Sequence, residues 1–295
     1  MAGGPLVSVL IPVYRAHTTL ARCLASLLAQ TLPDWEAVIA VDDGDPGYPE
    51  LLAAAGIADP RIRFVATDGV RTGVAHARNV ALAAARGRLA APLDADDTMA
   101  PERLATLAPL ALARGAASDN VQILEDTDGA LLRLWLEPGE GTVELDADRL
   151  LDDPVPVLPV VDRALGIRWV EVPICDDVVF NLLLLDRLGS YPIVRRAMRV
   201  YRQRPDSECN APDAVFRAEA GYRRVLAMLD SGELVLRPEL AQKVRASFRR
   251  RIALNAAFGR ARARGWVGSY QAFVARLSRC GRGSERSRGA RTRAR

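Results

Sequence analysis

The sequence predicts an α/β fold with a central, mostly parallel sheet and helices on its faces. Two observations carry this prediction. Short β-branched apolar runs alternate with amphipathic stretches over the first hundred residues, and Asp-rich turns directly follow two of those runs. Repeated strand–helix–strand units join parallel strands through right-handed crossovers. Such sheets bind ligands beyond the carboxyl ends of their strands, so the acidic turns mark the expected binding edge.

The first third of the chain supplies most of the expected sheet. β-Branched apolar runs predict strands at 7–13, 35–41, 62–66 and 88–93. Apolar residues three and four positions apart predict helices at 18–30 and 72–85, with a short helix expected at 48–55. The two acidic turns therefore follow the second and the fourth strand.

The middle of the chain has a weaker pattern. A hairpin is expected from two apolar runs around the turn at 126–129. Further expected elements are a helix at 155–165, strands at 168–172 and 197–201, and a strongly apolar helix at 176–188. From about 212 to 279 the pattern is helical. We therefore expect a domain at 1–210, a helical extension at 211–280 and a disordered basic tail at 281–295.

Composition and charge restrict the possible classes of protein. Of the 295 residues, 49% are hydrophobic and 26% charged, which excludes a wholly disordered chain, a coiled coil and a collagen-like fibre. Six arginines and one glutamate in 281–295 account for the positive net charge, so the remainder is near neutral and no nucleic acid partner is expected. The tail either contacts anionic lipid head groups or is an inert solubilising end.

The start of the chain has no basic region before its apolar run, and no run of 18 apolar residues exists. We therefore expect neither a signal peptide nor a transmembrane helix. The expected location is cytoplasmic, with peripheral membrane contact through 281–295 as an option.

The acidic turn at 94–97 is the strongest chemical signal. Asp94 and Asp96 are two positions apart and can reach one site from an extended turn. Hard oxygen ligands of this kind suit Mg²⁺ or Mn²⁺, which bind through one or two carboxylates and substrate phosphates. The alternative is a solvated turn in which Asp97 or Thr98 caps the next helix.

Four segments follow one another in a distinctive order. They are VSVLIPVYRA at 7–16, LASLLAQTLPDWEAVIAVDDGD at 24–45, GVAHARNVALAAARGRLAAPLDADD at 73–97 and CDDVVFNLLLL at 175–185. This set resembles the family 2 glycosyltransferases with the Rossmann-like GT-A fold. The resemblance is dense over 7–103, thin over 104–170, moderate over 171–207 and absent beyond.

The resemblance implies a nucleotide site at the ends of the first strands. Pro12 and Tyr14 would border the base, Asp43 would hydrogen-bond the base or ribose, and Asp94 would contact the ribose side or the sugar. A uracil-type base offers N–H donors to a carboxylate, which makes a UDP-sugar the expected donor. Tyr14 could instead lie at the edge of the core, and Asp42 is expected to stabilise its turn.

The resemblance also implies a site for the diphosphate. Asp96 would bind the metal that bridges the diphosphate, with Asp97 nearby, and Arg78 would face the diphosphate or pair with a neighbouring Asp. The segment VYRQRPDS at 200–207 resembles a family stretch in which a histidine approaches the metal. Arg204 lies in that region here, so fewer protein ligands would hold the metal, or Arg204 would itself contact the diphosphate.

The acidic pair at the start of the helix at 176–188 supplies the candidate base. In the family the second acid of this pair is the base, which selects Asp177, and Asp176 would orient the acceptor or cap the helix. A helix N-terminus favours an ionised carboxylate. The alternative is that both acids only cap the helix.

The resemblance therefore implies an inverting, metal-dependent transferase that moves a sugar from a nucleoside diphosphate sugar to a saccharide, lipid-linked or small-molecule acceptor. No Q-x-x-R-W motif of the processive synthases is present, so single addition is expected. The alternatives are a catalytically impaired binding or scaffold protein on the same fold, and a nucleotidyltransferase, for which the phosphate loop is missing. His17 and His76 are expected to be structural or surface residues.

Overall fold

The structure is a computed structural model that describes residues 4–152, 155–204, 214–267 and 273. Its strands form one ten-stranded sheet, in which the order of the main path is β3-β2-β1-β4-β9-β6-β10-β5. In that order the bounds are Ile62–Ala66, Trp35–Val41, Val7–Val13, Leu89–Pro92, Val160–Asp162, Ala116–Glu125, Tyr191–Gln203 and Thr98–Met99. Two further strands pair off this path, β7 (Leu131–Leu134) with β6 and β8 (Thr142–Leu145) with β10.

The half of the sheet that carries the acidic turns is parallel. β1 lies between β2 and β4, and β3 continues the same direction beyond β2. β9 is antiparallel to both β4 and β6, so β6 again runs parallel to β4, and β10 runs parallel to β6. The carboxyl ends of β1, β2, β4, β6 and β10 therefore lie along one edge of the sheet, which we call the site edge.

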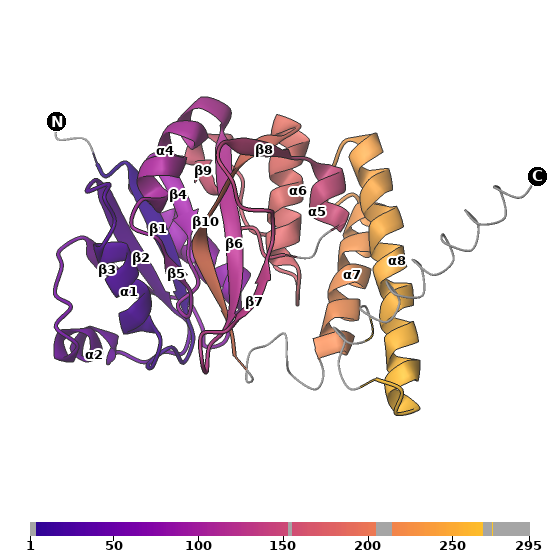
Figure 1. The fold of residues 1–295 in the computed structure, drawn as a ribbon, viewed down its shortest axis with the longest axis horizontal. Coiled ribbons are helices and arrows are strands. Elements are labelled where there is room, and N and C mark those ends of the chain that lie inside the picture. Colours follow the sequence, from indigo (N-terminus) through magenta and orange to yellow (C-terminus); the bar gives the residue numbers. More distant parts are fainter. Residues whose placement is uncertain (1–3, 153–154, 205–213, 268–272, 274–295) are drawn as a thin grey trace, which may run out of the picture.

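Helices cover both faces of the sheet (Figure 1). Side chains alternate along β1, so that Val9 and Ile11 face one core while Leu10 faces the other. The first core lies under α1 (Leu20–Leu28), α2 (Tyr48–Ala54) and α4 (Arg103–Arg114). The second core lies under α3 (Val74–Ala84), α5 (Ala147–Asp152) and α6 (Asp176–Leu188). The predicted α/β fold with a mostly parallel central sheet and flanking helices is confirmed.

The C-terminal helices α7 (Ala214–Ser231) and α8 (Pro238–Ala263) lie side by side beyond α6 (Figure 1). Val225, Val244 and Phe248 belong to the same buried cluster as Leu182 and Leu185 of α6. The helical region predicted after about 212 is therefore present, and it shares a core with the α/β body. The domain boundary at 210 stays a prediction, since 205–213 and the tail at 281–295 lie outside the described residues.

Several predicted elements of the middle region are wrong. The helix expected at 155–165 is an extended segment followed by β9 and a 3-10 turn. Pro156 and Pro159 disfavour a helix there, and the pair Val160 and Val161 joins β4 and β6. The strand expected at 168–172 has no pairing partner among the described strands. The last strand is much longer than the expected 197–201, and the helix α4 was not expected.

Candidate active site

The site edge brings together acids that are distant in sequence. Tyr14 follows β1, Asp43 follows β2 and Asp94 follows β4, and these three strands are neighbours in the sheet. Pro12 lies in β1 beside Ala40 of β2. Adjacent strands lie about 4.8 Å apart, so the predicted nucleotide residues share one short stretch of this edge.

Arg78 links the strand ends to the start of α6. Its Nη2 lies 2.5 Å from Oδ1 of Asp94, and its Nη1 lies 2.6 Å from Oδ2 of Asp176. The arginine is almost wholly buried, and the two carboxylates balance its charge. Arg78 therefore pairs with two acids, in line with the alternative that it pairs with a neighbouring Asp. The two ion pairs hold Asp176, the first acid of α6, beside the turn at 94–97.

Asp177 is the acid of this group that has no basic partner. No basic side chain among the described residues forms an ion pair with its carboxylate, which is partly buried at the N-terminus of α6. Burial and the charge of Asp176 raise the pKa of Asp177 to about 7, although Arg78 opposes that shift. A general base works best when its pKa lies near the working pH, so this environment suits proton abstraction near neutrality.

Asp96 and Asp97 have different environments although they are adjacent. Asp97 is wholly buried, pairs with Nη1 of Arg199 at 3.1 Å and accepts a hydrogen bond from the Arg202 backbone N–H. The Asp96 side chain is 27% exposed, and its Oδ2 lies 3.5 Å from Nη2 of Arg204. Asp96 therefore faces solvent at the site, while Asp97 anchors the acidic turn to β10.

The acids at the end of β4 fit a divalent cation by their chemistry. Asp94 and Asp96 are both about a quarter exposed and offer hard oxygen donors from one turn. Burial and the charge of Asp94 raise the pKa of Asp96, and Arg204 only partly offsets this effect. This anionic excess is what a metal ion neutralises. Among the described residues, however, no group of three or more His, Cys, Asp or Glu is placed to hold a metal by itself.

The acidic pair after β2 divides its roles. Asp42 accepts hydrogen bonds from the Thr72 hydroxyl at 2.6 Å and from the Gly73 N–H at 3.0 Å, so its side chain stabilises the loop before α3 and not only its own turn. Asp43 accepts from the Arg15 N–H and the Tyr48 hydroxyl, both at 2.7 Å. The hydrogen bond from Tyr48 and the others lower the pKa of Asp43 despite its partial burial, so it stays an ionised acceptor.

Backbone strain gathers at the same edge. Among the described residues, the non-glycine positions with positive φ are Arg15 at 52°, Arg71 at 58° and Cys175 at 71°. Arg15 follows Tyr14, and Cys175 directly precedes the acidic pair of α6. Such conformations cost about 1–3 kcal/mol each and are concentrated at functional sites.

Sequence reasoning missed the residues that support the acidic pair. The Asn79 side chain donates to the Trp169 carbonyl at 2.8 Å and accepts from the Trp169 N–H at 2.9 Å. Trp169 stacks on Phe180 of α6 with ring centroids 4.0 Å apart. Asn79 stands next to Arg78 in the quoted motif, but only the fold reveals that it holds the segment before α6.

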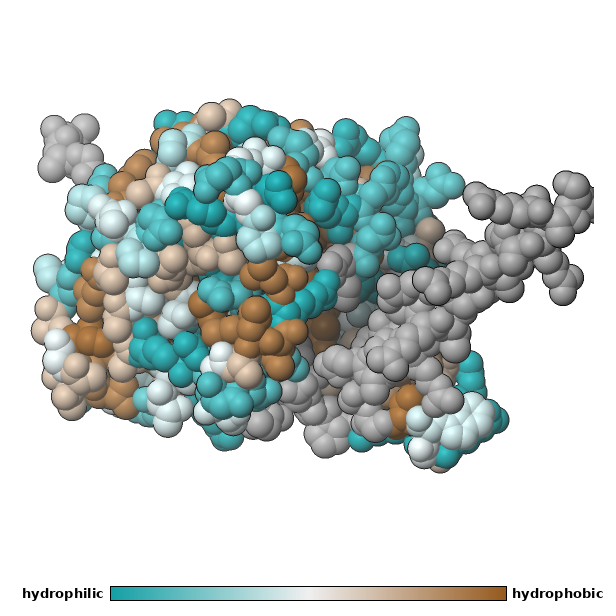
Figure 2. Space-filling view, viewed as in Figure 1, coloured by the Kyte–Doolittle hydropathy of each residue, from teal (hydrophilic) through white to brown (hydrophobic). Residues whose placement is uncertain are grey.

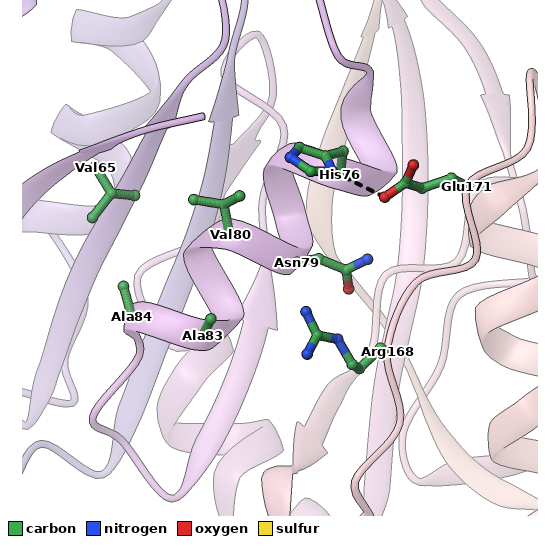
Figure 3. A pocket seen from close by; sticks show the side chains of 8 residues that line it. All are labelled: Val65, His76, Asn79, Val80, Ala83, Ala84, Arg168 and Glu171. Carbon is green, nitrogen blue, oxygen red and sulfur yellow. Dashed lines mark hydrogen bonds and ion pairs between the residues drawn. The ribbon is translucent and has the colours of Figure 1, made fainter. Parts of the chain in front are cut away.

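A cavity of about 460 Å³ lies beside α3, and none of the predicted site residues lines it (Figure 3). His76 and Glu171 meet across it, with Nδ1 and Oε1 2.9 Å apart, and Nε2 of His76 lies 2.8 Å from Oδ1 of Asp68. These contacts join α3 to the segments before and after it. They agree with the structural or surface role expected for His76, as does the contact of His17 with Asp45.

Residues 8–141 match the model of the family described as Glycosyl transferase family 2. This match assigns residues 8–141, a little under half of the chain, to glycosyl transferase family 2. The matched residues include β1, α1, β2, α3 and β4, the elements that form the site edge and its Asp-rich turn.

Two curated relatives of this chain are named for succinoglycan biosynthesis and for glucosyl transfer. The succinoglycan biosynthesis protein ExoO of Rhizobium meliloti (strain 1021) is 40% identical over 135 residues, which are 45% of this chain and 38% of that protein. The UDP-Glc:alpha-D-GlcNAc-diphosphoundecaprenol beta-1,3-glucosyltransferase WfgD of Escherichia coli is 35% identical over 99 residues, 34% of this chain and 38% of that one. The match to this chain thus spans under two fifths of these relatives' length.

Solved structures resemble this chain over more of its length than the curated relatives do. TarS 1–349 of S. aureus, in complex with UDP-GlcNAc, has a TM-score of 0.63 at 18% identity over 83% of this chain and 72% of that chain. The mannosyltransferase PcManGT from Pyrobaculum calidifontis, in complex with GDP-Man and Mn²⁺, has a TM-score of 0.54 at 19% identity. The likeness covers 99% of this chain and 83% of that chain. This chain has the GT-A fold of these neighbours.

Proposed function

We propose that this chain transfers a sugar from a nucleoside diphosphate sugar to an acceptor hydroxyl, with inversion and one addition at a time. The observation that carries the proposal is the double ion pair of Arg78, which sets the unpaired Asp177 beside the acids at the end of β4. An inverting transfer needs two separate sets of carboxylates. One carboxylate must be free to act on the acceptor, and the others must lie near the leaving diphosphate.

The proposed chemistry is a single displacement at the anomeric carbon. The Asp177 carboxylate takes the proton of the acceptor hydroxyl while the acceptor oxygen forms the new glycosidic bond. The bond from the anomeric carbon to the diphosphate breaks, and its electron pair leaves with the diphosphate. Arg204 can donate to that diphosphate from the other side of the turn.

Asp96, with Asp94 and the diphosphate oxygens, would hold Mn²⁺ or Mg²⁺. The bound ion would neutralise charge on the leaving group. Asp97 is assigned a positioning role in this proposal, because its carboxylate is buried against Arg199.

The donor is proposed to be a UDP-sugar, with its base between Tyr14 and Asp43. The UDP-GlcNAc bound by TarS supports a uridine nucleotide, whereas PcManGT binds GDP-Man. The relatives' names support an acceptor from polysaccharide synthesis, either a saccharide or a lipid-linked sugar such as the one in the name of WfgD.

The test is turnover by the full chain. Nucleoside diphosphate release is measured for a panel of UDP-, GDP- and dTDP-sugars with Mn²⁺, with and without saccharide and lipid-linked acceptors. Release that needs an acceptor and is lost in Asp177→Asn supports the transferase. The matched control is Asp152→Asn, an exposed acid at the end of α5.

The ion pair between Arg204 and Asp96 favours the second candidate, a protein that binds nucleotide sugars without transferring them. Donor binding by calorimetry without turnover on any acceptor would support this second candidate and would contradict the transferase.

A further inference from the structure

The exposed apolar side chains of the protein are distributed unevenly. Among the described residues, five of the eight exposed large hydrophobic side chains lie in or beside the loops at the site edge. They are Tyr14, Val70, Val74, Leu131 and Leu132, while Phe216 and Trp266 lie together at one end of the α7–α8 pair. The eighth, Val235, lies in the connection between α7 and α8 at the opposite end of that helix pair.

Topology explains why the five residues share one edge. β6 runs parallel to β4, so the turn that leads into β7 lies at the site edge, and β7 starts there with Leu131 and Leu132. These two leucines are 60% and 49% exposed. Hydrophobic side chains gather over β7 on the face drawn in Figure 2.

The helix pair α7–α8 carries a second group of exposed apolar side chains, in addition to the leucines of β7. Val215, beside Phe216, packs with Phe258 and Ala261 near the end of α8, so the start of α7 meets the end of α8. Phe216 is 76% exposed and Trp266 is 60% exposed, and both lie at this end. In Figure 1 this end lies along the lower side, as do the carboxyl ends of β1 and β2.

The same end of the helix pair is basic. Arg260 and Arg262 lie in the last turn of α8 and Arg264 follows it, with no acidic residue in 255–267. Arg260 and Arg262 are exposed, and within the described part of the chain no carboxylate pairs with either. We call Phe216, Arg260, Arg262, Arg264 and Trp266 the hairpin-end surface.

We propose that the hairpin-end surface docks onto an anionic lipid bilayer and that β7 enters the same interface, so that the site edge faces the membrane. Aromatic side chains beside arginines are typical of the bilayer interface, and unpaired arginines complement anionic head groups. Arginines on two copies of this surface would repel each other, which argues against self-association. No described helix has the length and apolar content needed to span a bilayer, which suits a peripheral mode.

The test is co-sedimentation of the full chain with phosphatidylcholine vesicles that contain or lack phosphatidylglycerol. The variants are Arg260→Gln with Arg262→Gln, and Phe216→Ser with Trp266→Ser. The matched control, Arg149→Gln with Arg187→Gln, removes the same charge from exposed positions on α5 and α6. A further full-length variant replaces the six arginines of 281–295 by glutamine and isolates the tail.

The wild type is expected to bind only the anionic vesicles, and each hairpin-end variant should lower the partition coefficient on the order of tenfold or more. The control and the tail variant should keep most of the binding, with unchanged thermal unfolding and donor affinity in all variants.

Equal binding to neutral vesicles, no binding by the wild type, or loss of binding only in the tail variant would overturn the proposal. A dimer that dissociates in the Phe216→Ser, Trp266→Ser variant, without any vesicle binding, would assign the surface to a second copy and would overturn it equally.

Discussion

The Nη1 of Arg199 lies 3.1 Å from Oδ2 of Asp97, and both side chains are almost wholly buried. The pair joins the long strand β10 to the acidic turn after β4. It therefore sets the position of the neighbouring Asp96, which faces the site.

Removal of one partner from this pair should be costly. Asp97→Asn leaves the Arg199 charge buried and unpaired, and it should lower the free energy of unfolding by about 3–5 kcal/mol. Asp96→Asn should cost less than about 1 kcal/mol, because Asp96 is partly exposed and its pair with Arg204 is long. Urea denaturation of the two variants measures the difference. Equal effects would contradict the assignment of distinct roles.

Asp96→Asn should instead abolish Mn²⁺-dependent binding of the donor. The carboxamide keeps the size of the side chain but removes the charge that holds the cation. Calorimetry with UDP-sugars, with and without Mn²⁺, measures the loss, and Asp152→Asn is the control. Full metal-dependent affinity in the Asp96→Asn variant would remove Asp96 from the site.

Arg204 is expected to contact the diphosphate once the donor is bound. Arg204→Gln should weaken UDP binding roughly tenfold to a hundredfold, the scale of one hydrogen bond to a charged group. Uridine binding should not change, because uridine carries no phosphate. An equal loss for both ligands would mean that Arg204 supports the fold of the site and does not contact the diphosphate.

The pKa of Asp177, raised to about 7, predicts the pH dependence of transfer. The base must be ionised, so the rate should fall as the pH drops below about 7. Asp177→Asn should lose roughly two to four orders of magnitude in rate and keep donor affinity. A variant with near-normal transfer would move the base to Asp176.

The same pKa shift has a consequence for stability. Folding disfavours ionised Asp177, because its folded-state pKa lies above the usual value of a free Asp. Above pH 7, Asp177→Asn should therefore be at least as stable as the wild type in thermal unfolding. A clear loss of stability there would show that Asp177 is a structural cap.

His76 should stabilise the protein at low pH and lose this effect as the pH rises. Its hydrogen bond to Glu171, and more weakly the charge of Asp68, raise the pKa of His76 above 6.5, while burial opposes the shift. The contribution is therefore complete below the unfolded pKa and lost as the pH rises through the folded pKa. His76→Gln should cost up to about 1 kcal/mol near pH 6, since both acids are exposed, and nothing near pH 9. Urea titrations at the two pH values measure it, and an equal cost at both would contradict the ion-pair account.

Strong local patterns predicted much of the fold. β1, β2, β3 and α6 have the bounds that the hydrophobic patterns gave, because each is a continuous apolar element whose turn or cap residues lie beside it in sequence. The parallel connection of the first strands followed from their alternation with helices, and with it the meeting of the acids after β2 and β4 at one edge.

Where long-range contacts decide the structure, the sequence alone was insufficient. A helix was predicted at 155–165, whereas Val160 and Val161 form a strand that pairs with both β4 and β6. Local propensity cannot reveal such long-range pairing. The pattern of residues 168–172 predicted a strand, but the backbone N–H and carbonyl of Trp169 bond to the Asn79 side chain, which no periodicity encodes.

The sequence by itself determined the family resemblance, the α/β framework and the group of acids from which the site is built. Only the tertiary structure decided which acid is paired and which is free. Arg78 occupies Asp94 and Asp176, Arg199 occupies Asp97, and Asp177 has no basic partner among the described residues. The physical reason is that charge pairing depends on distances of a few ångström between segments far apart in the chain, and burial then determines how strongly each pair shifts a pKa.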